Sequence, residues 1–207
     1  MHSERLTVFI IDDDASVRDS LALMLGLEGY RASVFADAEA FLAAWQDEWT
    51  GCVIADVRLP GRSGVELQEA LRKRGIGLPF VIITAHGDVA TARAAFRSQA
   101  VDFLEKPFDN RQLCAAIETA FALEERRIQK IDRRRADSEK LGRLTARERD
   151  VLKHAARGLH AKEIAAVLGI SPRTVEVHKT RIMEKLGVRN VAELVRFAIA
   201  AAPSDGD

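Results

Sequence analysis

The 207-residue chain has few of the features that mark secreted or membrane-spanning proteins. Its only cysteines, Cys52 and Cys114, form neither a close pair nor a metal-binding spacing, so we expect buried, reduced thiols. No apolar run approaches the roughly 20 residues of a membrane helix, and the polar start at residues 1–5 is unlike a signal peptide. We therefore expect a cytoplasmic protein with no membrane partner.

The chain also lacks net charge, because 31 basic and 31 acidic residues cancel. The cancellation hides an uneven distribution. Residues 1–123 carry 12 Lys and Arg against 18 Asp and Glu, a net of −6, whereas residues 143–202 carry 12 against 6, a net of +6. An acidic first half and a basic second half indicate separate roles, and a basic module is the usual footprint of nucleic-acid binding. Chance segregation of charge is the alternative.

Five short apolar runs alternate with helix-like stretches in the first half of the chain. The runs lie at residues 8–11, 32–35, 52–55, 80–83 and 101–104. Between them apolar residues recur at helical spacing, as at Val17, Leu21 and Leu25. This alternation predicts an α/β domain with a doubly wound, five-stranded parallel sheet.

Polar residues follow four of the five runs. Asp12 and Asp13 follow the first run, Asp56 the third, Thr84 the fourth and Lys106 the fifth. Open α/β sheets bind ligands beyond the carboxyl ends of their strands, so we expect these side chains to lie at one edge. Carboxylates there would bind Mg²⁺, while the hydroxyl and ammonium groups would bind phosphoryl oxygens.

Asp56 is the predicted nucleophile, because it stands alone after the central strand and precedes an open loop at residues 57–61. A carboxylate forms an aspartyl phosphate when the incoming group is held in line and its charge is neutralised. A haloacid-dehalogenase-like phosphatase is the alternative, since Asp12 and Asp14 form an Asp-x-Asp after the first strand. That alternative leaves Asp56 unexplained and needs a later acidic pair that the chain lacks.

Several segments of the first half occur in the order and at the spacing of one family. They are FIIDDD at 9–14, IAD at 54–56, LPG at 59–61, ITA at 83–85 and FLEKPF at 103–108. Residues 5–122 therefore resemble a CheY-type receiver domain of a two-component response regulator, and the HGDV stretch at 86–89 adds a resemblance to the receivers of FixJ-class regulators. The family commonly has a glycine before the fifth strand, where this chain has Gln99. A positive φ there would strain Gln99, unless the preceding helix ends differently.

The resemblance implies specific roles for the residues at the sheet edge. Asp56 would receive a phosphoryl group from a sensor histidine kinase. The implied Mg²⁺ ligands are Asp12, Asp13, Asp56 and the backbone carbonyl of Arg58. Thr84 would move inward to a phosphoryl oxygen and the Phe103 ring would fill the vacated space, although Phe103 is equally explained as a core aromatic. Asp14 is expected to cap a helix rather than bind metal.

Residues 123–142 are highly charged and contain no proline or glycine before Gly142. Ile117, Phe121, Ile128 and Ile131 lie at helical spacing, so we expect a helical linker. It is either a solvated charged helix or a short dimerising coiled coil.

The second half is predicted to be all-α, with four helices over residues 143–202 and a disordered tail at 203–207. A Thr145–Glu148 capping box starts the first helix, which runs to Gly158, and the second spans about 160–168 before Gly169. Ser171-Pro172 starts the third, and Asn190 caps the fourth. The second and third helices, joined by a short turn, form a helix-turn-helix.

Four segments carry a second resemblance: LTARER at 144–149, KEIA at 162–165, ISPRTVEVH at 170–178 and KLGV at 185–188. They resemble a LuxR/FixJ-type DNA-binding domain, and the two halves together resemble a FixJ-class regulator. One departure is Leu159-His160-Ala161, where the family usually has Ser-Asn before Lys162. The second helix is therefore expected to lack a strong side-chain cap.

Helical geometry divides the third helix, the recognition helix, into two faces. Val175, His178, Ile182 and Leu186 are expected to face the core, with His178 a hydrogen-bonded packing residue rather than a base reader. The residues expected to face the major groove are Glu176, Val177, Thr180 and Arg181. The residues expected at phosphates are Arg173, Thr174, Lys179 and Lys185. Glu176 is matched to cytosine and Val177 to a thymine methyl.

These expectations describe a DNA-binding response regulator rather than an enzyme, with self-phosphorylation and autodephosphorylation as its only chemistry. Phosphorylation would promote a homodimer that binds paired half-sites in promoter DNA. RNA polymerase is a further candidate partner. A constitutive DNA binder whose receiver serves only for assembly is the remaining alternative.

Overall fold

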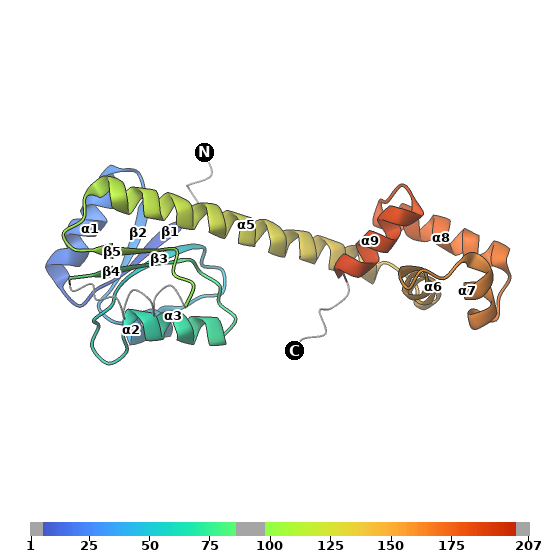
Figure 1. Ribbon diagram of the computed structural model, residues 1–207, viewed down its shortest axis with the longest axis horizontal. Helices are drawn as coiled ribbons and strands as arrows, with labels where there is room; N and C mark the ends of the chain where they lie inside the picture. The colour runs from blue at the N-terminus through green and yellow to red at the C-terminus, as the bar shows by residue number, and fades with distance from the viewer. Residues whose placement is uncertain (1–5, 86–97, 202–207) are drawn as a thin grey trace. The chain divides into compact units, whose positions relative to one another are not determined.

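The computed structural model of the protein describes residues 6–85 and 98–201 (Figure 1). The chain forms two compact units, residues 1–128 and residues 129–207, which are treated separately below. The HGDV segment at 86–89 and the tail at 203–207 lie outside the described residues.

The first unit is built on a parallel sheet with strand order β2-β1-β3-β4-β5. Its strands are β1 (Thr7–Ile11), β2 (Arg31–Phe35), β3 (Gly51–Asp56), β4 (Phe80–Thr84) and β5 (Asp102–Glu105). Each neighbouring pair is parallel, and β3 is buried at every position. The prediction of a five-stranded parallel sheet is confirmed.

Helices cover both faces of this sheet (Figure 1). Their bounds are α1 (Ala15–Leu27), α2 (Ala38–Ala44), α3 (Gly64–Lys73) and α5 (Asn110–Gly142). Alternate strand residues supply two cores, because successive side chains point to opposite faces. Ile10 and Ile54 pack with α1 and α5, whereas Phe9 and Val53 pack with α2 and α3. The doubly wound arrangement is therefore also confirmed.

Gln99, which precedes β5, has a φ of +67°. This is the left-handed region, which residues with a Cβ rarely adopt. The strain that we expected at the position of the family's glycine is therefore present.

An aromatic cluster fills the second core near the start of β3. It consists of Phe9, Phe35, Phe41, Trp45 and Trp49. Trp49 stacks on Phe9 with ring centroids 4.9 Å apart, and Trp45 meets Trp49 edge-on at 5.8 Å. The cluster contains both tryptophans of the chain.

Helix α5 continues past the receiver, as expected for a helical linker, and crosses the boundary between the units at residues 128 and 129. Just before that boundary Glu124 is fully buried and accepts two hydrogen bonds from Arg127, at 2.6 and 2.7 Å. Ile131 is 48% exposed.

The second unit contains α6 (Ala146–Ala156), α7 (Ala161–Leu168), α8 (Pro172–Leu186) and α9 (Val191–Ala201). The Thr145–Glu148 capping box, the Ser171 cap and the Asn190 cap are all present. Gly169 and Gly187 end their helices with φ of +66° and +70°. The first helix ends at Ala156, slightly before the expected Gly158. Of the helices in the described ranges, none combines the length and apolar character needed to cross a membrane.

Candidate functional site

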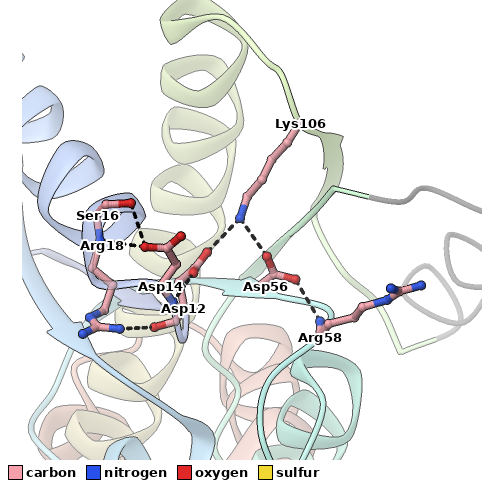
Figure 2. A network of polar contacts seen from close by, with 7 residues as sticks. All are labelled: Asp12, Asp14, Ser16, Arg18, Asp56, Arg58 and Lys106. Carbon is pink, nitrogen blue, oxygen red and sulfur yellow. Dashed lines mark hydrogen bonds and ion pairs between the residues drawn. The ribbon is translucent and has the colours of Figure 1, made fainter.

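The carboxyl ends of the strands gather the polar residues of the first unit (Figure 2). Asp12 directly follows β1, Asp56 ends β3, Thr84 ends β4 and Lys106 directly follows β5. Asp12 and Thr84 are each 1% exposed and Asp56 is 8% exposed. The structure therefore brings these residues to one sheet edge, where Asp12 and Thr84 are buried and Asp56 keeps a small exposed fraction.

Lys106 bridges the two carboxylates of the acidic site. Its Nζ donates to Asp12 Oδ2 at 2.8 Å and to Asp56 Oδ2 at 2.7 Å (Figure 2). Partial burial by itself lowers the pKa of Lys106, but the hydrogen bonds to both aspartates outweigh burial and raise that pKa. The ammonium group stays charged and compensates two carboxylates that would otherwise repel each other.

Backbone groups orient the same carboxylates from the other side. The Asp14 N–H donates to Asp12 Oδ1 at 2.9 Å, and the Arg58 N–H donates to Asp56 Oδ1 at 2.8 Å. Arg18 donates to the Asp12 carbonyl oxygen at 2.6 Å, while the Arg58 side chain extends away from the carboxylates (Figure 2). Each carboxylate thus has one oxygen fixed by the main chain and one fixed by Lys106.

Gly64 is a site residue that the sequence reasoning missed. It starts α3, and its N–H donates to the Val57 carbonyl at 3.2 Å. A Cβ at this position would lie 2.4 Å from the Asp56 carbonyl oxygen. The signal was available, because Gly64 is the first helical residue of the Ser63–Glu66 capping box. Glycine is required there because the helix begins against the backbone of Asp56.

The carboxylates fit a hard cation only in part. Asp12 and Asp56 each direct one carboxylate oxygen to the same ammonium group. Carboxylate oxygens are also suitable ligands for a divalent cation. Asp13, however, is exposed, and no three or more His, Cys, Asp or Glu side chains within residues 6–85 and 98–201 are grouped closely enough to hold a metal. The three-carboxylate cluster expected from the sequence is therefore not preassembled.

The remaining receiver residues have separate environments. Asp14 caps α1 by accepting from the N–H and the hydroxyl of Ser16, at 2.8 and 2.7 Å, and these bonds lower the pKa of Asp14. This agrees with its expected role as a cap. Thr84 is buried, and Phe103 is half-buried and packs against the second core of the sheet.

The exposed face of α8 carries most of the expected base readers. Glu176, Val177, Thr180 and Arg181 are exposed, and Arg173 at the start of the helix is exposed as well. Thr174 is half-buried, and its N–H donates to the Ser171 cap.

Val175, Ile182 and Leu186 form the buried face of α8, as expected. His178 is half-buried, but its Nδ1 has no hydrogen-bond partner among the described residues. The hydrogen bond that we expected for His178 is therefore absent at Nδ1 among those residues.

Lys179 and Lys185 require a correction, because neither is a free surface cation. Lys179 is 7% exposed and its Nζ lies 3.1 Å from Glu176 Oε1. It follows Val175 by four residues and precedes Ile182 by three, so it lies on the buried stripe. Lys185 donates to Glu148 Oε2 at 2.6 Å, and Glu148 is 3% exposed. That bond joins α8 to α6.

Two family models match this chain. The response regulator receiver domain matches residues 8–118, and the bacterial regulatory proteins of the luxR family match residues 142–198.

Full-length relatives are similar over nearly the whole chain. The transcriptional regulatory protein FixJ of Azorhizobium caulinodans is 42% identical, covering 98% of this chain and 97% of that protein. FixJ of Rhizobium meliloti is 42% identical, covering 94% and 95%. Among solved structures, the response regulator StyR gives a TM-score of 0.81 at 42% identity, covering 94% of this chain and 98% of StyR. Full-length FixJ from B. japonicum gives 0.59 at 40% identity, covering 95% and 97%.

Proposed function

Because the chain belongs to the response regulators that join a receiver domain to a LuxR-type DNA-binding domain, we propose that phosphorylation of Asp56 controls its binding to promoter DNA. The observation that carries the proposal is the bridge from Lys106 to both Asp12 and Asp56. The bridge joins two carboxylates and a counter-charge at one sheet edge, and this supports Asp56 as the nucleophile. The FixJ relatives are named as transcriptional regulatory proteins, which supports transcription as the output.

The chemistry is a transfer of one phosphoryl group. An oxygen of Asp56 forms a bond to phosphorus, the phosphorus–nitrogen bond to the donor histidine of a sensor kinase breaks, and the imidazole leaves with the electron pair and takes up a proton. Lys106 then donates to a phosphoryl oxygen in place of the Asp56 oxygen it now holds. Asp12, Asp13, Asp56 and the Arg58 carbonyl would hold Mg²⁺, which supplies charge neutralisation when bound.

Thr84 and Phe103 carry the signal in this proposal. The Thr84 hydroxyl bonds a phosphoryl oxygen, and the ring of Phe103 moves into the space that Thr84 leaves. Phe103 has no polar group, so burying it further has no desolvation cost.

The second unit supplies the output. The exposed face of α8 enters the major groove, where Glu176, Val177, Thr180 and Arg181 meet base edges and Arg173 meets phosphate. A phosphorylation-induced homodimer would place two such helices about one DNA turn apart, on paired half-sites. Such a regulator works in the cytoplasm beside the chromosome, with RNA polymerase as a candidate partner.

Intact-mass measurement after incubation with acetyl phosphate and Mg²⁺ tests the phosphoacceptor. The wild-type chain should gain one phosphoryl group, and Asp56→Asn should gain none, because the side-chain amide of asparagine is not a nucleophile at neutral pH. Asp14→Asn is the matched control. Because Asp14 caps α1, this substitution should leave the phosphoryl adduct intact. An adduct that survives Asp56→Asn would reject the proposal and favour a phosphatase that uses Asp12.

Gel-shift titration tests the coupling to DNA. Wild type should bind promoter duplex more tightly when a phosphodonor and Mg²⁺ are present, whereas Asp56→Asn should not respond. An equal rise in the affinity of both proteins would count against Asp56, and no change in either protein would instead indicate a constitutive DNA binder.

A further inference from the structure

Arg147 connects the first helix of the DNA-binding unit to the turn that precedes the recognition helix. It lies in the first turn of α6, and its Nη2 donates to the carbonyl oxygen of Leu168, the last residue of α7. Gly169 follows in the left-handed region, and Ser171 then caps α8. One side chain therefore bridges α6 to the turn of the helix-turn-helix.

The Leu168 carbonyl is one of the last four in α7, which have no partner within their own helix. The Ala165 carbonyl is satisfied by the N–H groups of Gly169 and Ile170. Leu168 instead depends on Arg147, and a cation at a helix C-terminus is also stabilised by the helix dipole. The bond therefore has a specific acceptor and a favourable field.

We infer that Arg147 is a positioning residue for sequence-specific DNA recognition. By holding the Leu168 carbonyl it fixes the turn against α6, and so it fixes the direction in which α8 leaves the turn. Base-edge contacts depend on that direction, because each needs a donor and an acceptor in register. Attraction to phosphates depends on it much less. The inference rests on the proposed function of α8 in the major groove.

The same geometry argues against a direct phosphate contact by Arg147. Its side chain is half-buried and its guanidinium is bound to a protein carbonyl. Removing it should therefore change the discrimination between sequences rather than the number of neutralised phosphates.

Arg149 provides a matched control on the same helix. Its Nε donates to the carbonyl oxygen of Leu144 at 3.2 Å, in the segment just before α6. Arg147→Met and Arg149→Met each remove one arginine and one bond to a backbone carbonyl. They differ in the position of that carbonyl. The acceptor of Arg147 lies at the end of α7, where the turn into α8 begins, whereas the acceptor of Arg149 lies before α6.

With a phosphodonor and Mg²⁺ present throughout, the experiment measures the binding of full-length protein to two duplexes over a series of salt concentrations. One duplex is selected from a random pool by the wild-type protein, and the other is a scrambled duplex of the same length and composition. Arg147→Met should lose about tenfold in affinity for the selected duplex only, with the salt dependence unchanged. Arg147→Lys, which keeps a donor, should recover part of the loss, and Arg149→Met should match wild type.

Three outcomes would overturn the inference. Unchanged discrimination in Arg147→Met would show that the bridge does not position α8. Equal losses on both duplexes, with a salt slope shallower by about one, would make Arg147 a phosphate contact. A wild-type protein that selects no duplex would reject the proposed function and this inference with it. If circular dichroism shows that Arg147→Met is unfolded, Arg147→Gln is used in its place. The ratio of its affinities for the selected and scrambled duplexes then tests the inference.

Discussion

Gly64 shows how a residue without a side chain can determine the geometry of the acidic site. A Cβ added there would lie 2.4 Å from the Asp56 carbonyl oxygen, so Gly64→Ala must displace either α3 or the end of β3. We expect it to destabilise the first unit by about 1–3 kcal/mol and to slow phosphorylation of Asp56. Urea unfolding and the rate of adduct formation with acetyl phosphate measure the two effects.

Gly26 offers the control for that substitution. It lies within α1 and a Cβ there would meet nothing within 4 Å. Gly26→Ala should raise stability by about 0.5–1 kcal/mol through helix propensity and leave phosphorylation unchanged. Equal effects of the two substitutions would refute the steric explanation.

Gln99 is the second residue whose backbone carries a measurable strain. Its φ of +67° is easily adopted by glycine, so Gln99→Gly should stabilise the first unit by about 0.5–1 kcal/mol. Gln99→Ala keeps the strain and should give no gain. Thermal unfolding of both variants compares them directly, and a gain in Gln99→Ala alone would contradict the prediction.

At the scale of elements, one ion pair joins α6 to α8 beside the hydrophobic core that they share. Glu148 accepts from Lys185 at 2.6 Å and also from the Thr145 N–H at 2.8 Å. The hydrogen bond from Lys185 is the main cause that lowers the pKa of Glu148. Glu148→Gln should destabilise the second unit by about 1–3 kcal/mol at pH 7.

The sign of the pH dependence follows from that lowered pKa. A carboxylate whose pKa is lower in the folded state adds stability above its unfolded value of about 4.3. This stability is lost as the pH falls through the folded pKa. Wild type and Glu148→Gln should therefore differ at pH 7 and converge at lower pH. A difference that stays constant down to pH 3 would rule out the ion pair as its source.

The same helices show which features the sequence could predict. Capping residues are local signals, so Thr145, Ser171 and Asn190 located their helices correctly. The prediction that Lys179 would lie on the solvent side of α8 was wrong. Its charge suggested solvent, whereas its spacing from Val175 and Ile182 places it on the buried stripe. The pairing of Lys185 with Glu148 joins residues 37 positions apart, and no local pattern encodes such a contact.

For the acidic site, sequence reasoning found the strand ends because parallel topology brings them together. It identified Asp12, Asp56 and Lys106 as neighbours, but it did not predict that the ammonium group would bridge both carboxylates or that Asp13 would face solvent. Those details depend on loop backbone, such as the N–H of Asp14 and of Arg58, which no residue pattern specifies.

At the scale of the whole molecule, two compact units predict two unfolding transitions. Residues 1–128 and 129–207 form distinct compact units, connected along the chain by α5. Gly64→Ala should therefore lower only the first unit's transition, and Glu148→Gln only the second's. Chemical denaturation followed by circular dichroism and by fluorescence separates them, and a single transition moved by both variants would indicate one cooperative unit.

The neighbouring indoles of Trp45 and Trp49 are intrinsic fluorescent probes of the protein. Both belong to the first unit, so selective excitation of tryptophan gives fluorescence from the receiver and none from the DNA-binding half. A change in emission when duplex is added must then arise from a response of the receiver. Communication from output to input can thus be followed without attaching a dye.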